Sequence, residues 1–562
     1  MKNKKKMLMC VLSAFLVLSL LAACGGKTDS NKQAEGSGNT TTSEGTKTEE
    51  AAPASDKYEL GKEPLEFTFY GHYDWYTMPT WGQDESTKWI KENKKVDIKA
   101  IQSGGAAAQK LNTMIATNEL PDVIWMDRGP DVDKLRQADM LVPFDDYLDK
   151  YPNLKTWFAE NGMNMLRSDD GKLYQFPNWY TSQPNGNAGY VVNKKIYTEL
   201  GSPKIETTED LYNYLKQVKA KYPDVTPFET GLAKDGQGLD ILYSAFKANN
   251  KGFSAKGVMA VPTDGKLTSI FKDEPYRQSM VYASKLFREK LITQDAMTQT
   301  KDQEKEKVMT GRVAVYATSS PTDIAQLAQP DLAKKDPNGG YIMIPPVHAE
   351  GVPADQVFPG SYKQLGWNVS VITKAAKNPE AIFAFLDWYT GPEGQSVQMW
   401  GPEGKYWQGL ESDGITPKFT DAYVTEADAL AKLQGETVNL MWNGNTVFLD
   451  KTKAKYEATL PLEKRSWATH WQSTVTWKTQ SDATEFVNLT PMPESEEGIA
   501  LQRINDIFVE SRAKALFAKN DAEVLAILDK AAADADTAGF PKLLEFETNK
   551  WQENLKKMNG GK

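Results

Sequence analysis

Short apolar strands and amphipathic helices alternate through residues 65–126, and this alternation constrains the fold more than any other feature of the chain. The segments rich in aromatic and β-branched residues, which is typical of strands, are 65–70, 96–101 and 123–126. Apolar residues have helical spacing over 109–117, and another helical pattern ends near Asn93. Strands that alternate with helices in this way predict a parallel sheet in an α/β domain.

A second series of elements extends the α/β prediction along the chain. We expect strands at 189–193, 312–316, 341–344 and 367–372, and helices at 207–221, 276–290, 304–310 and 379–389. From about Ser495 the pattern is helical, which is typical of a packing scaffold. In open α/β sheets, ligands bind beyond the carboxyl ends of the strands. The loops 71–76 and 127–129 are therefore candidate positions for a site.

The N-terminus has the three parts of a secretory signal. Four lysines within the first six residues precede an apolar stretch over 7–20, and a run of small residues ends at Cys24. The stretch is too short for a transmembrane helix, which needs about 20 apolar residues. The sequence Leu21–Cys24 resembles the cleavage site of bacterial lipoproteins, in which the cysteine becomes the lipidated first residue. We therefore expect a signal peptide at 1–23 and acyl chains on Cys24.

The chain has two cysteines, and only one would remain after processing. Cys10 lies in the apolar stretch and would be removed with the signal peptide. Without a disulfide, stability has to come from a large core, which a chain of this length can bury. The segment 24–57, which begins with the lipidated cysteine, has hardly any large apolar residues, so we expect a flexible tether there.

The charge pattern narrows the classes of partner. The formal net charge is −9, and basic residues are interspersed with acidic ones, as on an ordinary solvated surface. Proteins that bind nucleic acid show a basic patch or stripe, and none is visible in the sequence. No stretch after the signal is long and apolar enough to cross a bilayer. We expect no nucleic acid partner and contact with the membrane through Cys24 alone.

Six segments, in order along the chain, resemble the extracellular solute-binding proteins of bacterial ABC importers. They are Glu119–Val123, Asp170–Pro177, Val192–Gly201, Met309–Ala314, Ile372–Trp388 and Gly401–Trp407. The resemblance is to the sugar-binding group (family 1) that includes the maltodextrin-binding proteins. The last segment resembles a loop of the larger lipoprotein members from Gram-positive bacteria. Each motif alone is unspecific, whereas their order behind a lipoprotein-like signal is specific.

The resemblance implies an α/β fold of the two-lobe, periplasmic-binding-protein-like type II, with the ligand in an interlobe cleft and a helical C-terminal region. Hinge motion about the crossing segments would close the cleft. The implied parts are 58–177 for the first part of lobe 1, 178–345 for the main part of lobe 2, 346–400 for the return into lobe 1, and 401–562 for a mainly helical region packing on both lobes. The resemblance also implies a monomer that delivers its ligand to the permease subunits of an ABC importer.

Aromatic residues indicate which ligand the implied cleft would take. The chain has 15 tryptophans, 23 tyrosines and 21 phenylalanines. Sugars present flat C–H faces to aromatic rings and hydroxyls to planar polar side chains, so a carbohydrate ligand is predicted; for any single tryptophan, packing is the alternative. The candidate ligand contacts follow strands or flank the implied crossings: Tyr73, Asp74, Trp75, Trp125, Asp127, Trp179, Tyr180, Ser319, Ser320 and Trp367. We hypothesise that Trp75 or Trp367 stacks on a sugar ring.

The sequence offers little support for enzyme chemistry. None of the three histidines stands in a zinc motif, and no Gly-x-Ser-x-Gly elbow occurs. We expect no cofactor and no metal, because the acidic segments 169–171 and 336–339 are typical of turns and do not match a calcium loop. Two alternatives stay open: an oligopeptide-binding protein of an importer, and a secreted glycosidase, which needs only two carboxylates about 5–9.5 Å apart.

Overall fold

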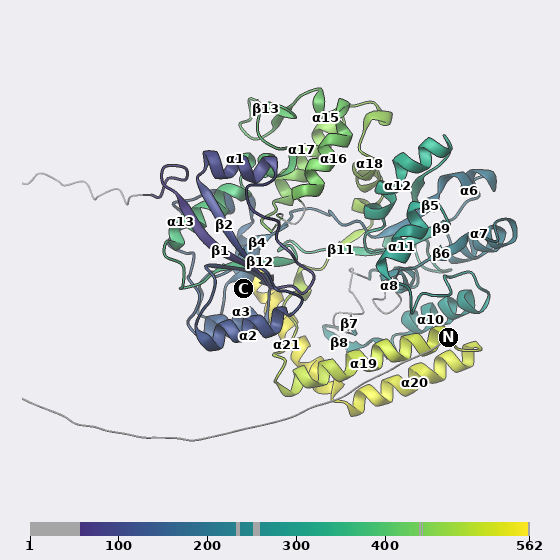
Figure 1. Ribbon diagram of the computed structural model, residues 1–562. Helices are drawn as coiled ribbons and strands as arrows, with labels where there is room; N and C mark the ends of the chain where they lie inside the picture. Colours follow the sequence, from purple (N-terminus) through teal and green to yellow (C-terminus); the bar gives the residue numbers. More distant parts are fainter. Residues whose placement is uncertain (1–56, 232–236, 251–258, 438–439, 441, 560–562) are drawn as a thin grey trace, which may run out of the picture. The chain divides into compact units, whose positions relative to one another are not determined.

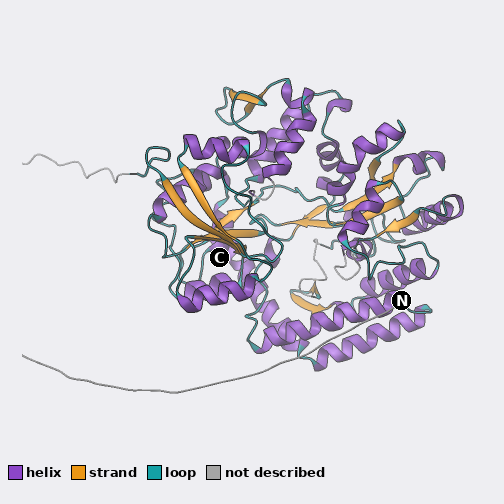
Figure 2. Ribbon diagram, viewed as in Figure 1, coloured by secondary structure: helices purple, strands orange, loops and turns teal. Residues whose placement is uncertain are grey.

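The computed structural model describes residues 57–231, 237–250, 259–437, 440 and 442–559. The signal peptide expected at 1–23, Cys24 and the tether as far as residue 56 lie outside the described residues. Within the described chain, helices and strands alternate first through one sheet and then through another (Figures 1 and 2). The chain ends in a series of long helices.

The first sheet has five strands in the order β2-β1-β3-β12-β4. The strands are β1 (Leu65–Gly71), β2 (Val96–Ile101), β3 (Val123–Asp127), β4 (Phe176–Asn178) and β12 (Asn368–Ile372). β1 runs parallel to β2 and β3, so the predicted parallel arrangement is confirmed for the first three strands. β12 runs antiparallel to β3 and β4. The start of β12 therefore lies at the edge where β1 and β3 end.

Helices pack on both faces of this sheet, and we refer to the sheet with its helices as lobe 1. The helices are α1 (Glu85–Asn93), α2 (Ala107–Thr117), α3 (Pro130–Gln137), α4 (Asn153–Trp157), α5 (Glu160–Leu166), α13 (Pro379–Thr390) and α14 (Pro392–Trp400). Phe67 and Phe69 of β1 point into the core shared with α1 and α13, whereas Tyr70 points into the core shared with α2 and α3. Successive side chains alternate between faces, as a strand buried on both sides requires.

The second sheet has four strands in the order β10-β5-β9-β6. The strands are β5 (Gly189–Asn193), β6 (Thr226–Glu229), β9 (Val313–Thr318) and β10 (Tyr341–Ile344). With α6 (Lys194–Glu199), α7 (Thr208–Lys221), α8 (Gln237–Ser244), α10 (Glu274–Arg288), α11 (Lys301–Met309) and α12 (Pro321–Lys335) it forms lobe 2. Thr207 and Asp210 form a reciprocal capping box that begins α7. The strands and helices predicted here from hydrophobic patterning are confirmed, with boundaries shifted by up to three residues.

Three crossing segments join the two sheets. The first leaves lobe 1 after β4, and the second returns to it between β10 and β12. The third is a later segment that ends in β15 (Gln480–Asp482). β15 pairs in parallel with β11 (Gly360–Tyr362) of the returning segment. A side chain at Gly186 of the first crossing or at Gly360 would collide with the amide of Gln480. The three crossings are therefore in direct contact, and glycine permits the close approach.

The C-terminal region is mainly helical, as predicted. Its elements are β13 (Trp407–Leu410), β14 (Pro417–Phe419), α15 (Ala422–Thr425), α16 (Ala427–Thr437), α17 (Thr446–Glu457), α18 (Trp467–Thr474), α19 (Glu496–Leu516), α20 (Asp521–Thr537) and α21 (Phe540–Met558). α21 contacts α5 of lobe 1 and the hairpin of β7 (Ala260–Thr263) and β8 (Lys266–Ser269), while α19 and α20 contact α10 of lobe 2.

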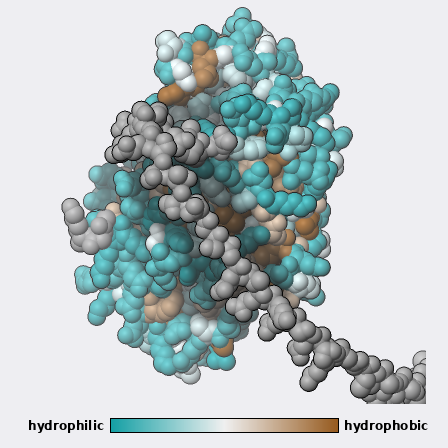
Figure 3. All heavy atoms as spheres, turned by 90° about the vertical axis from the view of Figure 1, so that its left-hand side faces the viewer, coloured by the Kyte–Doolittle hydropathy of each residue, from teal (hydrophilic) through white to brown (hydrophobic). Residues whose placement is uncertain are grey.

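Most side chains on the face drawn in Figure 3 are hydrophilic, and hydrophobic ones gather in a few patches. Within the described part of the chain, no helix has both the length and the apolar character that a membrane span requires. Large apolar side chains that do reach the surface include Trp75 and Trp367, of which 62% and 44% are exposed. Both belong to lobe 1.

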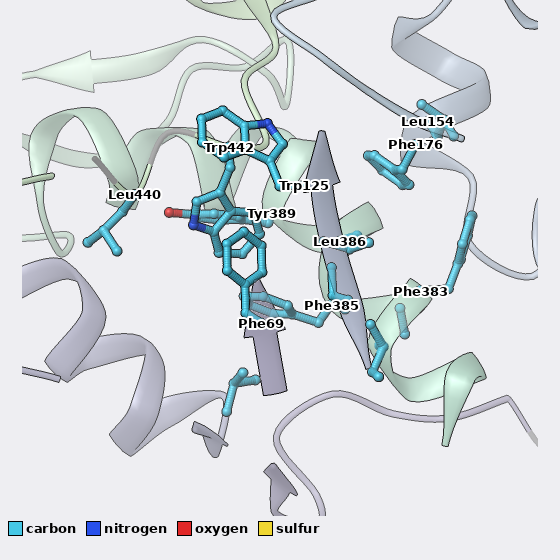
Figure 4. Close-up of a cluster of buried hydrophobic side chains, with 14 of the residues drawn as sticks. Phe69, Trp125, Leu154, Phe176, Phe383, Phe385, Leu386, Tyr389, Leu440 and Trp442 are labelled. Atoms are coloured by element: carbon cyan, nitrogen blue, oxygen red, sulfur yellow. The ribbon is translucent and has the colours of Figure 1, made fainter. Parts of the chain in front are cut away.

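The larger core of lobe 1 is rich in aromatic rings (Figure 4). The ring centroid of Trp442 lies 4.6 Å from that of Phe69 and 5.5 Å from that of Tyr389. All three side chains are almost completely buried. Full burial of a large apolar side chain contributes about 1.5–3 kcal/mol relative to exposure, so these rings are a main source of stability for the lobe.

Candidate functional site

Four aromatic side chains gather at one edge of the first sheet, and we call Tyr73, Trp75, Trp125 and Trp367 the aromatic platform. Tyr73 and Trp75 lie in the loop after β1, Trp125 is the middle residue of β3 and is level with the end of β1, and Trp367 immediately precedes β12. β3 lies between β1 and β12, and β12 runs antiparallel to it. The carboxyl ends of β1 and β3 and the amino end of β12 therefore meet at this edge.

The rings of the platform are in mutual contact. The ring centroid of Tyr73 lies 5.2 Å from that of Trp75 and 5.5 Å from that of Trp367, the two exposed tryptophans. The centroids of Trp75 and Trp367 are 6.4 Å apart, and their planes are inclined by only 30°. Trp125 is buried and packs edge-on, 4.8 Å from Tyr73 and 5.4 Å from Trp367. The platform thus has a buried base and two neighbouring indole rings open to water.

Such an exposed surface points to a ligand. Exposed single apolar residues are common, whereas a contiguous exposed aromatic patch marks an interaction site. Tryptophan is a large, rigid side chain that provides much contact area at little cost in conformational entropy. A flat apolar partner with a polar rim, such as a sugar ring, fits the exposed indole rings and the polar side chains beside them.

A tyrosine–carboxylate pair provides the polar part of the platform. The Tyr73 hydroxyl donates a hydrogen bond to Asp127 Oδ1 at 2.7 Å. Burial, together with the Asp127 carboxylate, raises the pKa of Tyr73, so its hydroxyl stays protonated and remains a donor. Asp127 is exposed and has further lone pairs available, so it can accept hydrogen bonds from ligand hydroxyls.

Two cationic side chains flank the platform. Arg128 follows Trp125 by three residues, and its Nη1 donates to the carbonyl oxygen of Leu365 at 3.2 Å. Lys363 precedes Trp367 by four residues, at the start of a turn in which the Gly366 N–H donates to the Lys363 carbonyl oxygen at 3.0 Å. Gly366 has a φ of +68°, and a Cβ there would collide with the Asn178 carbonyl, so this turn needs glycine.

Five of the ten predicted site residues meet at this edge: Tyr73, Trp75, Trp125, Asp127 and Trp367. Asp74 lies in the same loop but points elsewhere. Its Oδ1 accepts a hydrogen bond from the Ala107 N–H at 2.7 Å, at the start of α2. The N-cap residue Ala106 has no side-chain oxygen, so Asp74 supplies the helix cap from a distant loop. In this structure its role is to hold α2.

Trp179 and Tyr180, predicted together, have different surroundings. Tyr180 is fully buried, and its hydroxyl lies 2.8 Å from Thr390 Oγ1 in the core of lobe 1. Trp179 is half-buried, has a φ of +54°, and its N–H donates to the Gly444 carbonyl oxygen at 2.7 Å. A side chain at Gly444 would collide with the Trp179 ring. Tyr180 is therefore placed as a packing residue, whereas part of Trp179 reaches the surface close to the turn before Trp367.

Ser319 and Ser320 belong to lobe 2. They follow the carboxyl end of β9 and directly precede α12. Ser319 is exposed, and the Ser320 N–H donates to Thr318 Oγ1 at 3.2 Å. The structure therefore places the predicted serines at the strand end where an α/β sheet binds ligands, but on a different sheet from the platform.

Arg128 and Lys363 were not among the residues predicted to form the site. Arg128 lies inside the loop 127–129 that follows a predicted strand, so its position was visible in the sequence although no role was assigned to its charge. Lys363 lies in an irregular segment, and no local pattern marks it. Only the antiparallel insertion of β12 beside β3 brings Lys363 to the platform.

The described residues contain no group of three or more His, Cys, Asp or Glu side chains arranged to hold a metal ion. The acidic segments predicted to be turns are turns. Asp170 Oδ1 accepts from the Lys172 N–H at 3.0 Å, and Asp336 Oδ1 accepts from the Asn338 N–H at 2.9 Å. Each carboxylate thus closes an Asx turn.

Comparison with known proteins identifies one family. Residues 77–396 match the model of the family described as "Bacterial extracellular solute-binding protein". The fructooligosaccharide ABC transporter substrate-binding protein FusA of Streptococcus pneumoniae serotype 4 is 26% identical over 318 residues, which are 53% of this chain and 56% of FusA. The polygalacturonan/rhamnogalacturonan-binding protein YtcQ of Bacillus subtilis is 28% identical over 255 residues, 42% of this chain and 46% of YtcQ. The chain thus spans about half the length of these curated relatives.

Solved structures share the fold at low sequence identity. FusA of S. pneumoniae in complex with kestose is 20% identical with a TM-score of 0.65, covering 87% of this chain and 99% of that chain. An extracellular solute-binding protein from Bifidobacterium longum subsp. infantis is 18% identical with a TM-score of 0.67, covering 87% of this chain and 98% of that chain. The predicted two-lobe α/β fold with a helical C-terminal region is thereby confirmed.

Proposed function

We propose that this chain, which belongs to the bacterial extracellular solute-binding protein family, captures a carbohydrate outside the cell and delivers it to the permease of an ABC importer. The observation that carries the proposal is the aromatic platform with its two exposed tryptophans at the carboxyl edge of the first sheet. The names of FusA and YtcQ, both of which bind oligosaccharides or polysaccharides, support a carbohydrate for this chain as well.

Binding would use the two sheets together. Trp75 and Trp367 would pack on the faces of a sugar ring, and Asp127 would accept hydrogen bonds from its hydroxyls. Ser319 and Ser320 would contribute hydroxyls from lobe 2, and Trp179 would contribute ring surface from the first crossing segment. A ligand that contacts both lobes favours a closed arrangement, because it gains contacts there that the open form does not offer. The contacting crossings at Gly186, Gly360 and Gln480 would act as the hinge.

A ligand screen by thermal shift tests this proposal. Oligosaccharides and oligopeptides of two to six units are each added in excess to the purified chain. A compound that binds only the folded state stabilises it by about 2.7 kcal/mol at 100 times its Kd and raises the Tm. We expect shifts with oligosaccharides. Shifts with peptides alone would replace the proposal with an oligopeptide-binding protein.

We propose that the protein does not transform its ligand. Family membership supports this, since the family is one of solute-binding proteins. Incubating the protein with each oligosaccharide that raises the Tm, and measuring new reducing ends, separates a binding protein from a glycosidase. Release of reducing ends at a steady rate would establish the glycosidase alternative.

We also propose that acyl chains on Cys24 anchor the protein to the outer face of the cell membrane, as a monomer. The sequence ending at Cys24 supports this, as does the similarity to LipO, a lipoprotein of B. subtilis that is 24% identical over 53% of this chain and 59% of LipO. Two acyl chains on one cysteine provide the double attachment that stable anchoring needs. A Cys24→Ala variant should appear in the culture medium. If this variant stays in the membrane fraction, Cys24 is not the anchor.

A further inference from the structure

Two charged groups beside the aromatic platform act on the Lys363 ammonium, Arg128 and Asp127. Arg128 and Lys363 are cationic, whereas Asp127 is a carboxylate that also accepts the hydrogen bond from Tyr73. The chain as a whole has a formal net charge of −9. Around Lys363, by contrast, two cations stand beside one carboxylate; the other carboxylates at this edge are engaged elsewhere, Asp74 by the Ala107 N–H and Asp131 by His72.

Both cations are held on the elements that carry platform tryptophans. Arg128 follows β3, which contains Trp125, and Lys363 opens the turn that leads to Trp367. The hydrogen bond from Arg128 Nη1 to the Leu365 carbonyl ties the guanidinium to that same turn. One short loop thus fixes both cations relative to the indole rings, which is the arrangement a ligand-binding group needs.

Neither cation is fully partnered within the described residues. The Nε of Arg128 is buried and has no hydrogen-bond partner there. The Lys363 ammonium makes no ion pair or hydrogen bond with any described residue. Lys374, just beyond the other end of β12, is paired with Asp139 at 2.6 Å, so the lysines that flank this strand differ in this respect.

The charge on Arg128 disfavours the charge on Lys363. Lys363 has part of its side chain exposed, yet protein atoms crowd the ammonium, and this burial together with Arg128 lowers the pKa of Lys363 to about 8. Burial lowers the pKa of Arg128 to about 10, although Asp127 opposes the shift. An anion in contact with both groups would oppose both shifts, because it would favour the charged form of each.

We infer, building on the proposed carbohydrate function, that the ligand is an acidic oligosaccharide whose carboxylate is received by Lys363 and Arg128 while its sugar ring packs on Trp75 and Trp367. The guanidinium and ammonium would donate charge-assisted hydrogen bonds to the two carboxylate oxygens. Asp127, already bonded by Tyr73, would face the hydroxyls on the other side of the ring. The charge of the ligand, as well as its shape, would then determine affinity.

The test compares matched acidic and neutral sugars. Trisaccharides of galacturonate, mannuronate and glucuronate, their carboxyl-reduced counterparts and neutral kestose are titrated into the full chain by calorimetry. We expect at least one uronate trisaccharide to bind about tenfold or more tighter than its reduced counterpart, since hydrogen bonds to charged groups have that magnitude. The preference should decrease in high salt.

A pair of lysine variants locates the effect. Lys363→Gln should reduce affinity for the acidic trisaccharide about tenfold and leave affinity for the reduced one unchanged. Lys377→Gln is the matched control, because Lys377 is an exposed lysine five residues beyond the far end of β12, as Lys363 is five residues before its start. It should change neither affinity. A Tm equal to that of the unmodified chain verifies that each variant folds.

The outcomes separate this inference from the proposed function. If the reduced trisaccharides or kestose bind as tightly as the uronates, or if Lys363→Gln and Lys377→Gln behave alike, the inference is overturned while carbohydrate capture stands. If no sugar in the panel or in the thermal-shift screen binds, carbohydrate capture itself is contradicted, and this inference falls with it.

Discussion

Lobe 1 contains two aromatic clusters that are built from the same residue types and have opposite surroundings. The core cluster of Phe69, Tyr389 and Trp442 is buried between β1 and α13. The aromatic platform lies at the end of the same sheet, and its two outer tryptophans are exposed. Ring separations are similar in the two clusters, so ring contact alone does not distinguish packing from binding.

Exposure at the carboxyl edge of the strands is what distinguishes the platform. Trp125 links the two clusters, because it belongs to the buried core and also supports Tyr73 and Trp367. The core thus gives the platform a rigid base, and the platform offers surface that folding leaves uncovered. The comparison teaches that a tryptophan of the core cluster should affect stability and one of the platform should affect affinity.

The largest expected effect is on stability, from Trp442→Ala in the core cluster. Removing a buried tryptophan leaves a cavity and should lower the free energy of unfolding by about 3–5 kcal/mol. Urea unfolding followed by circular dichroism measures it. The fraction that remains folded should bind sugar with unchanged affinity. A loss of affinity without a loss of stability would remove the distinction between the two clusters.

The next largest effect is on affinity, from Trp75→Ala or Trp367→Ala in the platform. A central aromatic contact contributes about 2 kcal/mol, so each variant should bind the cognate sugar roughly 30-fold more weakly in calorimetry. Stability should change by less than about 1 kcal/mol, because both side chains are already largely exposed. Phe517→Ala is the matched control, since this aromatic is 50% exposed in the C-terminal region and should leave affinity intact. Unchanged affinity in both tryptophan variants would rule out the platform.

A smaller effect concerns pH and the cations beside the platform. Lys363, with its pKa lowered to about 8, is charged below that pH and neutral above it. The charged groups that face it are Arg128, which keeps its charge to about pH 10, and Asp127. A bound anion stabilises the ammonium, so affinity for trigalacturonate should be constant below pH 8 and fall about tenfold as pH rises above it.

The variant Lys363→Gln provides the control for this pH dependence. It has no ammonium to lose, so its affinity for trigalacturonate should stay flat between pH 7 and 9.5. The carboxyl-reduced trisaccharide should show no pH dependence with the unmodified chain. A decline of equal steepness in the variant would assign the pH effect to another group.

The smallest expected effect comes from Asp74→Ala, one residue from Trp75. This change removes the hydrogen bond to the Ala107 N–H at the start of α2, which should lower the free energy of unfolding by about 1 kcal/mol. Affinity for sugar should stay the same. Asp74→Asn retains an acceptor oxygen and should recover most of the stability. A weaker affinity in Asp74→Ala, with stability intact, would return Asp74 to the ligand-contacting set.

Much of the fold could be predicted because its elements are locally encoded. The strand at 96–101 and the strand at 189–193 have the predicted bounds, since β-branched and aromatic runs between turn residues are visible without any tertiary contact. The helix beginning after Thr207 could be predicted from its capping residues. The reversed direction of β12 could not, because strand direction in a sheet is set by pairing with residues more than 200 positions away.

The candidate site was predictable in part for the same reason. Residues at or just beyond strand ends, such as Asp127 and Tyr73, could be found because strand ends can be located from the sequence. Tyr180 also follows a strand, yet its side chain is fully buried with a hydrogen bond to Thr390. Local pattern does not tell which side of the backbone faces the core at an irregular crossing. Asp74 likewise serves a helix cap that only the folded chain brings near.

The sequence by itself determined the alternation of strands and helices and the loops in which a site could lie. It also predicts an export signal that ends at Cys24. Only the tertiary structure decided which loops meet. The antiparallel placement of β12 beside β3 brings Trp367 and Lys363 to Tyr73, Trp75 and Arg128, and it leaves two indole rings exposed. The reason is physical: local propensities form each element, whereas the order of strands and the exposure of each ring depend on long-range packing.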